Sequence, residues 1–217
     1  FDVEKFADFK SIKGSIFYKV INYGKNVKLL EDVPHKKVLD LAVVFYLLIK
    51  QEDDVNATAL IHNNHLKTWG VTENEVYKEA VINTPRMFAS EIKPLSCMLG
   101  EMAGNKEEEL SKEDYESMIL SSKYSELYVL TNSCRINGAA CIFYDTVLEK
   151  FANLIDEDLF ILPSSIHEVI ILPKSNEYDK KKLVQMVREV NAEGVAAEEI
   201  LSDNVYDNVS TAAIGVA

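Results

Sequence analysis

One apolar stretch in the first quarter of the chain limits the folds that the chain can adopt. Between Val38 and Ile49, most residues are Val, Ile, Leu, Phe or Tyr. This composition is typical of a strand buried on both faces, whereas a half-exposed strand alternates apolar and polar residues. The longest apolar run, Leu41 to Ile49, is much shorter than the roughly 20 residues that a membrane helix needs. We therefore expect a central strand in a water-soluble protein.

The segments around this strand predict a hairpin and two helices. Residues 57–62 form a second β-rich run after a polar turn at residues 51–56, which indicates an antiparallel hairpin. Before the central strand, residues 2–9 and 12–21 carry apolar side chains three and four positions apart. That spacing favours amphipathic helices.

Three further helices are indicated in the middle of the chain. Thr72 and Glu75 have the spacing of a capping box, and the helix that they begin is predicted to end before Pro85. A second helix is predicted over residues 91–102. Ser111 and Asp114 are placed to cap a third, short helix.

The C-terminal half has a regular order of predicted elements. We expect strands at residues 126–131 and 138–144, a helix at 145–155, strands at 159–162 and 168–172, and a helix at 179–190. Asn137 and Gly138 tolerate positive φ, which suits the turn between the first two strands. This β-β-α-β-β-α order predicts an α+β fold with a mainly antiparallel sheet and flanking helices, which we place on one face.

Length and composition favour one compact domain. A chain of 217 residues, 47% of them hydrophobic, can bury roughly 70% of its unfolded surface without metals or disulfides. We expect a single domain over residues 1–205, with sub-lobes at 1–110 and 111–205. The small and polar residues 206–217 predict a loosely ordered tail.

Charge and cysteine content restrict the partners and the compartment. With 35 acidic and 23 basic residues the net charge is −12, so the chain is expected to repel a nucleic-acid backbone. The three cysteines are odd in number and lack CxxC spacing, which favours free thiols in the cytoplasm. We predict a monomer or weak homodimer, with no membrane association and with a protein as the expected kind of partner.

Two histidines suggest a weak metal site. His62 and His65 could bind a metal together with Glu52, Asp53 or Asp54 from the preceding turn, because zinc takes three or four converging ligands. A pair at a strand-to-helix junction does not place both rings on one helical face, and asparagines 63 and 64 are ordinary helix caps. We favour the structural interpretation, with no metal.

A second weak group suggests a hydrolase. His167 could act as a base for Ser164 or Ser165, yet the GxSxG pattern of a nucleophile elbow is missing and Pro163–Ser165 is typical of a tight turn. Cys134 could serve as the nucleophile instead, because the neighbouring Arg135 would lower the pKa of its thiol. The other candidate thiol, Cys141, lies among apolar residues, which indicates an inert buried side chain.

Two other features favour structure over chemistry. Trp69, the single tryptophan, precedes Gly70, and we expect it to pack between two elements. The glycines form neither GxGxxG nor GxxxxGK[ST], so no phosphate-binding loop is indicated and no cofactor is expected.

Several stretches carry a resemblance that covers most of the chain, from about Val20 to Tyr206. They are, in order, LLEDVPHKKVLDLAVVFYLLI, IHNNHLKTWGVTENEVY, YVLTNSCRINGAACIFY, DLFILPSSIHEVIILP and MVREVNAEGVAAEEILSDNVY. Together they resemble a bacterial protein family known only as a domain of unknown function. The resemblance implies a bacterial origin and residence in the cytoplasm, and it implies no activity, cofactor or catalytic residue. Members of the family are expected to carry an additional leading segment that this sequence lacks.

The sequence thus leaves two functions open. The first is a non-enzymatic, cytosolic binding or protein-interaction protein, favoured because no group of residues combines nucleophile, base and charge stabiliser. The alternative is an enzyme: a hydrolase that uses Cys134 or Ser165 with His167, or a metal-dependent enzyme at His62 and His65. A pocket that gathers such residues would favour the enzyme.

Overall fold

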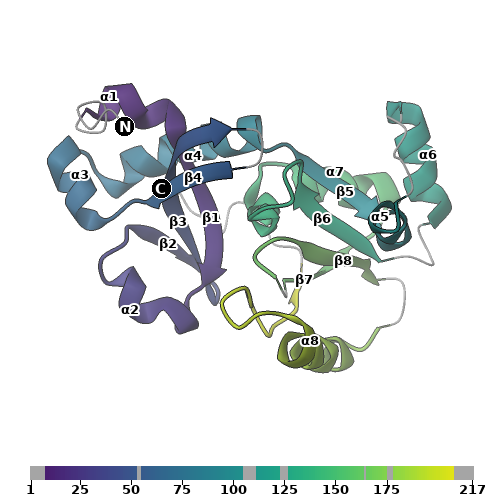
Figure 1. The fold of residues 1–217 in the computed structure, drawn as a ribbon. Coiled ribbons are helices and arrows are strands. Elements are labelled where there is room, and N and C mark those ends of the chain that lie inside the picture. The colour runs from purple at the N-terminus through teal and green to yellow at the C-terminus, as the bar shows by residue number, and fades with distance from the viewer. Residues whose placement is uncertain are drawn as a thin grey trace. The chain divides into compact units, whose positions relative to one another are not determined.

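The computed structural model describes residues 8–52, 55–104, 111–122, 127–163, 165–174 and 178–207 (Figure 1). The chain divides into two compact units, Phe1–Ala89 and Ser90–Ala217, and each is described by itself. Both contain an antiparallel sheet and helices, so the α+β class is confirmed. The single domain expected over residues 1–205 stays a prediction.

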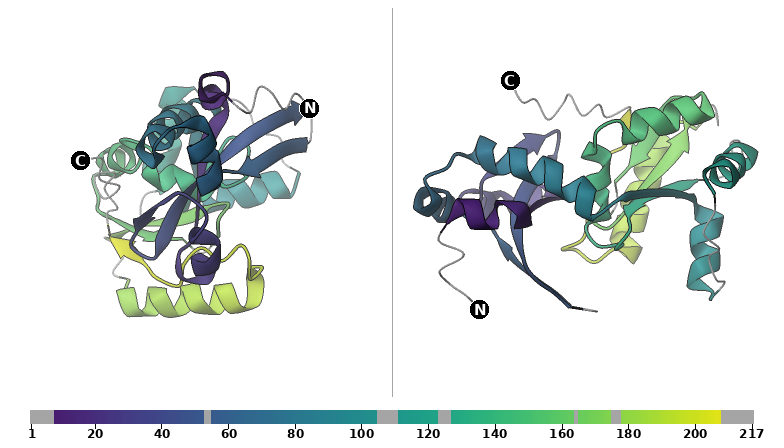
Figure 2. Two further views of the ribbon diagram at one scale, coloured as in Figure 1. Left: turned by 90° about the vertical axis from the view of Figure 1, so that its left-hand side faces the viewer. Right: turned by 90° about the horizontal axis from the view of Figure 1, so that it is seen from above.

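The sheet of the first unit is built on the apolar stretch. Strand β3 pairs antiparallel with β1 along one edge and with β2 and β4 along the other. All side chains from Leu41 to Leu47 are buried, as predicted for a strand with two covered faces. The expected hairpin is β3–β4, and it extends past the end of β1 (Figure 2). The strands are β1 (Ile16–Asn22), β2 (His35–Val38), β3 (Leu41–Glu52) and β4 (Val55–Leu60).

The helix predicted over residues 12–21 is wrong. A short helix α1 (Phe9–Ile12) and a 3-10 turn (Lys13–Ser15) lead into strand β1. Three successive side chains at the start of this strand, Ile16, Phe17 and Tyr18, are buried, so apolar cover is needed on both faces and not on one helical stripe. Pairing with β3 therefore outweighs the local spacing. Of the helix predicted over residues 2–9, all but the last two residues lie outside the described residues.

Helix α4 (Glu73–Met87) closes the outer edge of β1. The backbone N–H of Tyr18 donates to Thr84 Oγ1 at 3.0 Å, and Asn83 Nδ2 donates to the carbonyl of Ile16 at 3.0 Å. Side chains of a helix thus satisfy backbone groups that an edge strand would otherwise present to another chain.

The ends of α4 confirm one prediction and correct another. Thr72 and Glu75 form the predicted capping box, with the backbone N–H of Thr72 2.8 Å from Glu75 Oε2. The predicted end before Pro85 is wrong, because the helix continues through Pro85 to Met87. Pro85 lacks the N–H that would bond to the carbonyl of Val81. Thr84 Oγ1 donates to the carbonyl of Ala80 at 2.7 Å, and the backbone N–H of Phe88 donates to the carbonyl of Thr84 at 2.9 Å, so hydrogen bonding continues past the proline. Two shorter helices of this unit are α2 (Val27–Leu30) and α3 (Asn63–Trp69).

The second unit contains a five-stranded antiparallel sheet in the order β5-β6-β8-β7-β9. Three strands match the predicted segments, whereas β5 and helix α5 (Leu95–Met102) together replace the helix expected over residues 91–102. Of the tail predicted to be loose over residues 206–217, Tyr206 and Asp207 form strand β9, with Tyr206 buried, and the rest lies outside the described residues. The strands are β5 (Ser90–Pro94), β6 (Tyr128–Asn132), β7 (Leu159–Leu162), β8 (Val169–Pro173) and β9 (Tyr206–Asp207).

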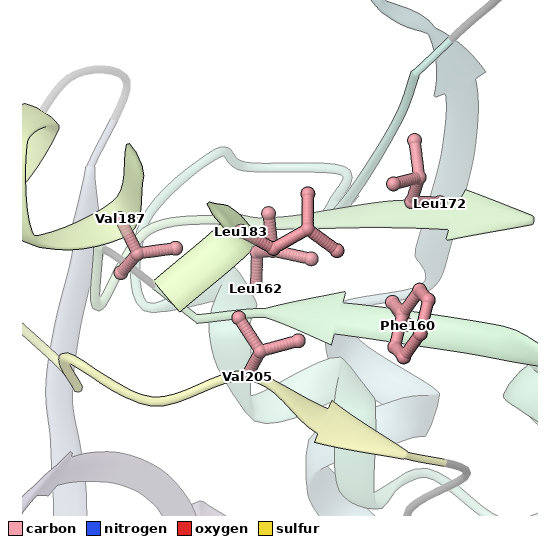
Figure 3. Close-up of a cluster of buried hydrophobic side chains, with 6 residues drawn as sticks. All are labelled: Phe160, Leu162, Leu172, Leu183, Val187 and Val205. Carbon is pink, nitrogen blue, oxygen red and sulfur yellow. The ribbon is translucent and has the colours of Figure 1, made fainter. Parts of the chain in front are cut away.

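Helices cover both faces of this sheet, not one as predicted. On one face, helix α8 (Lys180–Gly194) buries Leu183 and Val187 against Leu172 and its neighbours (Figure 3). On the other face, Phe151 of helix α7 (Val147–Ile155) meets the ring of Tyr128 at 5.0 Å between centroids. Tyr128 pairs with Ile171, the residue next to Leu172, so the two helices lie on opposite sides. Helix α6 (Lys112–Ser122) has the predicted cap, with the backbone N–H of Asp114 3.1 Å from Ser111 Oγ.

The strand predicted over residues 138–144 is wrong. Residues Gly138–Phe143 form a fully buried 3-10 helix, η4, so the C-terminal half does not follow the β-β-α-β-β-α order. The reason is that β6 already pairs with β5 and β8, which leaves no free edge beside it.

Among the described residues, no helix is long and apolar enough to cross a membrane.

We predict that Gly138→Ala destabilises the protein. A Cβ atom at this position would lie 2.2 Å from Thr131 Oγ1 and 2.4 Å from the carbonyl oxygen of His167. Overpacking of this kind lowers the free energy of unfolding by about 1–3 kcal/mol, measurable by urea denaturation. The control is Gly14→Ala, where a Cβ meets nothing within 4 Å. Equal stability of the two variants would contradict the prediction.

Candidate functional site

The two histidines of the weak metal site lie where α3 begins. The backbone N–H of His62 donates to Nδ1 of His65 at 2.9 Å, and Nδ1 of His62 lies 2.8 Å from Asp32 Oδ2. One nitrogen of each ring is therefore already used within the protein. Among the described residues, no group of three His, Cys, Asp or Glu side chains is arranged to hold a metal ion. Asp53 and Asp54 lie outside the described residues.

His65 belongs to a row of rings. It stacks on Trp69 with 5.5 Å between centroids and 25° between planes, and Trp69 in turn lies 6.2 Å from the ring of Phe9. Burial, and then the nearby His62, lower the pKa of His65. These contacts are those of a ring packed at the end of a helix.

The second weak group is centred on His167, in the segment between β7 and β8. Its backbone N–H donates to Ser165 Oγ at 3.0 Å, so the serine bonds to the main chain and not to the imidazole. Nδ1 of His167 accepts the backbone N–H of Asn137 at 3.3 Å, which places the ring proton on Nε2. Nε2 faces Glu199 Oε1 at 3.4 Å. Ser164 lies outside the described residues.

Among the described residues, no hydrogen bond joins either candidate thiol to His167. Cys134 is exposed in the turn after β6, and its backbone N–H donates to Asn132 Oδ1 at 3.0 Å. The side chain of Arg135, expected beside the thiol, forms an ion pair with Glu101. Cys141 is buried in η4 with its Sγ 3.2 Å from the carbonyl of Thr131, and burial raises the pKa of this thiol to about 12.

A cavity of about 720 Å³ lies elsewhere in the second unit, and the sequence did not indicate it. We call it the β5 cavity, because four successive residues of β5 line it together with residues of α6 and α7. Successive strand residues point to opposite faces, so a cavity that touches four in a row lies against the edge of the strand. Its lining residues are Ser90, Glu91, Ile92, Lys93, Lys112, Tyr115, Glu116, Val147, Lys150, Phe151 and Leu154.

The pairing register shows which backbone groups of β5 face this edge. The backbone N–H of Leu95 donates to the carbonyl of Leu127 at 2.7 Å, and Lys93 pairs with Val129, two positions further along each strand. Bonded and non-bonded pairs alternate in an antiparallel ladder. The N–H and C=O groups of Glu91 and Lys93 therefore point to β6, and those of Ser90 and Ile92 point away from it.

Part of this outward edge is already closed. The hydroxyl of Tyr115 donates to the carbonyl of Ile92 at 2.9 Å, and Pro94 has no backbone N–H. Burial raises the pKa of Tyr115 to about 12, so the hydroxyl keeps its proton near neutral pH. Among the described residues, neither the N–H and C=O groups of Ser90 nor the N–H of Ile92 has a hydrogen-bond partner.

The charges around the β5 cavity are unevenly paired. Lys93 Nζ lies 3.2 Å from Glu101 Oε1 and 3.6 Å from Glu91 Oε2, and Lys112 Nζ lies 3.6 Å from Glu116 Oε1. Lys150 is exposed and forms no ion pair with any described residue. The cavity thus combines an apolar wall with one lysine that has no ion-pair partner in the described part of the chain.

We predict that Cys134 and Cys141 differ in their rates of alkylation. Cys141 is buried with a pKa of about 12, so almost no thiolate forms near pH 8, whereas Cys134 is exposed. Iodoacetamide followed by peptide mass spectrometry should show Cys134 modified in the native protein and Cys141 modified only in guanidinium. Similar rates at the two positions would contradict the buried placement.

We also predict a pH dependence that originates at His65. Since its folded pKa is lowered from 6.5, the unfolded chain binds the proton more tightly, and stability decreases as the pH falls through that value. The Tm should drop further between about pH 7.5 and pH 5.5 in the wild type than in His65→Asn, whose amide oxygen can still accept the N–H of His62. Equal pH dependence would contradict the prediction.

Comparisons with known proteins add a family and no activity. Neither the curated proteins nor the solved structures contain a match to the chain. Among protein families, residues 1–208 match a family of unknown function, DUF5688. Since the match spans far more than half of the chain, the protein belongs to this family.

Proposed function

We propose that the protein is a non-enzymatic binding protein of the cytoplasm that recognises a protein partner at the β5 cavity. The observation that carries this proposal is the cavity itself, about 720 Å³ in volume, set against an incompletely paired strand edge. Ligand sites are commonly hollows of roughly 300–1,000 Å³ with an apolar lining and a few polar groups. The β5 cavity has this size and this mixture.

The lining of the cavity supports binding rather than chemistry. Its ionisable side chains are mostly in pairs with one another, and the hydroxyl of Tyr115 is engaged with the carbonyl of Ile92. A hydrolytic site needs a nucleophile within hydrogen-bond reach of a base. The strongest candidate base, His167, has both nitrogens directed to Asn137 and Glu199, and neither ring nitrogen bonds to Ser165.

Charge and cysteine content support the kind of partner and the compartment. A net charge of −12 disfavours nucleic acid, and three cysteines without a disulfide among the described residues suit a reducing compartment. We propose a monomer or weak homodimer as the resting form.

The proposal is tested by NMR on the isotope-labelled protein. A fragment library and a library of blocked peptides are titrated, and we expect backbone shifts that cluster in β5, α6 and α7. Val147→Trp fills the cavity and should abolish these shifts, while Met186→Trp, on an exposed position of α8, should leave them unchanged. Mass spectra should show every bound compound intact. Shifts confined to other elements, or conversion of a bound compound, would disprove the proposed function.

A further inference from the structure

We propose that the partner of the β5 cavity is an extended peptide segment, apolar and acidic in composition, that adds to the edge of β5 as a further strand. This inference rests on the proposed function and specifies its ligand. It follows from three features of the described residues: the open backbone groups, the apolar wall and the unpaired cation.

The backbone groups require an extended partner. Ser90 offers an N–H and a C=O, and Ile92 offers an N–H, all directed away from β6. An added strand satisfies such groups with its own main chain, and this contact gives affinity without regard to sequence. A small molecule without an alternating donor and acceptor pattern would satisfy at most part of the set.

The length of the open edge limits the contact. Beyond Ile92 the edge is closed, because Tyr115 caps the carbonyl of Ile92 and Pro94 has no N–H to donate. The main-chain contact therefore spans about three residues of β5, from Ser90 to Ile92. Such a short ladder is weak, so side chains of the peptide must supply the remaining affinity.

The wall of the cavity selects apolar side chains. Phe151 and Leu154 of α7 line it on the face of the sheet that also carries Ile92. In an added strand, alternate side chains would point to this face. Apolar residues at alternate positions of the peptide would then be buried against α7.

Charge complementarity selects an acidic group. Of the three lysines in the lining, Lys93 and Lys112 face glutamates, and Lys150 forms no ion pair with any described residue. A peptide carboxylate near Lys150 gains a charged partner, whereas a basic peptide would leave Lys150 unpaired and add repulsion. An RNA strand would bring many phosphates to a site with one unpaired cation and two glutamates, Glu91 and Glu116.

The test uses two libraries of blocked hexapeptides with threonine at alternate positions. The three positions between the threonines, which would face α7, carry two β-branched residues together with one aspartate in the first library or one lysine in the second. Fluorescence anisotropy on the full chain should show binding of the aspartate library and at least about tenfold weaker binding of the lysine library. Methylation of the backbone nitrogen that faces Ser90 should weaken the best peptide by about tenfold. Hydrogen exchange at the amide of Ile92 should slow in the complex.

Matched variants separate the contributions of backbone and charge. Ser90→Pro removes an N–H that faces away from β6, so it should weaken peptide binding about tenfold while the sheet is retained. Lys150→Glu should also weaken peptide binding about tenfold, because it replaces the attraction of the peptide carboxylate by repulsion. The control Lys182→Glu, at an exposed position on α8, should leave peptide binding unchanged. Thermal melting of each variant shows whether it is folded. If Ser90→Pro does not fold, the methylated peptide gives the same answer on the wild-type protein.

The outcomes distinguish this inference from the proposed function. Peptide binding at the β5 cavity that is insensitive to backbone methylation, with unchanged exchange at Ile92, overturns strand addition and leaves the proposed function intact. If only small carboxylic acids bind at the β5 cavity and no peptide does, strand addition is likewise overturned and the proposed function is left intact. Failure of every fragment and peptide to perturb β5, α6 and α7 overturns both.

Discussion

A sheet of few strands leaves unpaired backbone groups along its two outer strands, and each unit of this chain must deal with that constraint. In the first unit, Thr84 and Asn83 of α4 satisfy main-chain groups of β1, so the helix acts as a substitute for a neighbouring strand. In the second unit the same task at β5 is only partly done, by one tyrosine hydroxyl and one proline. The edge of β1 is thus covered by a helix and serves a structural role, whereas the partly open edge of β5 borders the candidate site.

The elements that can be predicted from the sequence are those that burial or a local hydrogen bond alone determines. The apolar stretch at β3 could be assigned because a strand covered on both faces contains few residues that suit anything else. The capping box at Thr72 was equally readable, since both partners lie three residues apart and no distant contact is needed. In both cases the residues that determine the element lie within the element itself or at its end.

Two segments have a conformation that depends on a distant part of the chain, and for them the local sequence pattern predicts the wrong element. Residues 16–22 have a helical spacing of apolar side chains, but pairing with β3 makes them a strand. Residues 138–143 have a composition typical of a strand, but β6 has no free edge to receive one, and a buried 3-10 helix results. Neither outcome follows from the segment itself, because in each case a partner far along the chain determines the backbone conformation.

The β5 cavity was missed for the same reason. Its lining comes from three segments of the chain. The single helix predicted over residues 91–102 leaves no place for β5, the strand that borders the cavity. One local signal was present: the segment Ser90–Pro94 ends in a proline, which within sheets is confined to edge strands, strand ends and bulges. The candidate histidines, by contrast, were conspicuous in sequence, and their rings are occupied by main-chain groups and carboxylates of the fold.

The crowding around Gly138 has a consequence for how this family can diverge. Three segments meet there without spare room: the end of β6 at Thr131, the start of η4, and the main chain at His167. A larger residue at position 138 can be accommodated only if the side chain at position 131 and the main chain at His167 both move away. Relatives with a side chain at position 138 should therefore also differ at position 131 and in the path of the main chain near His167.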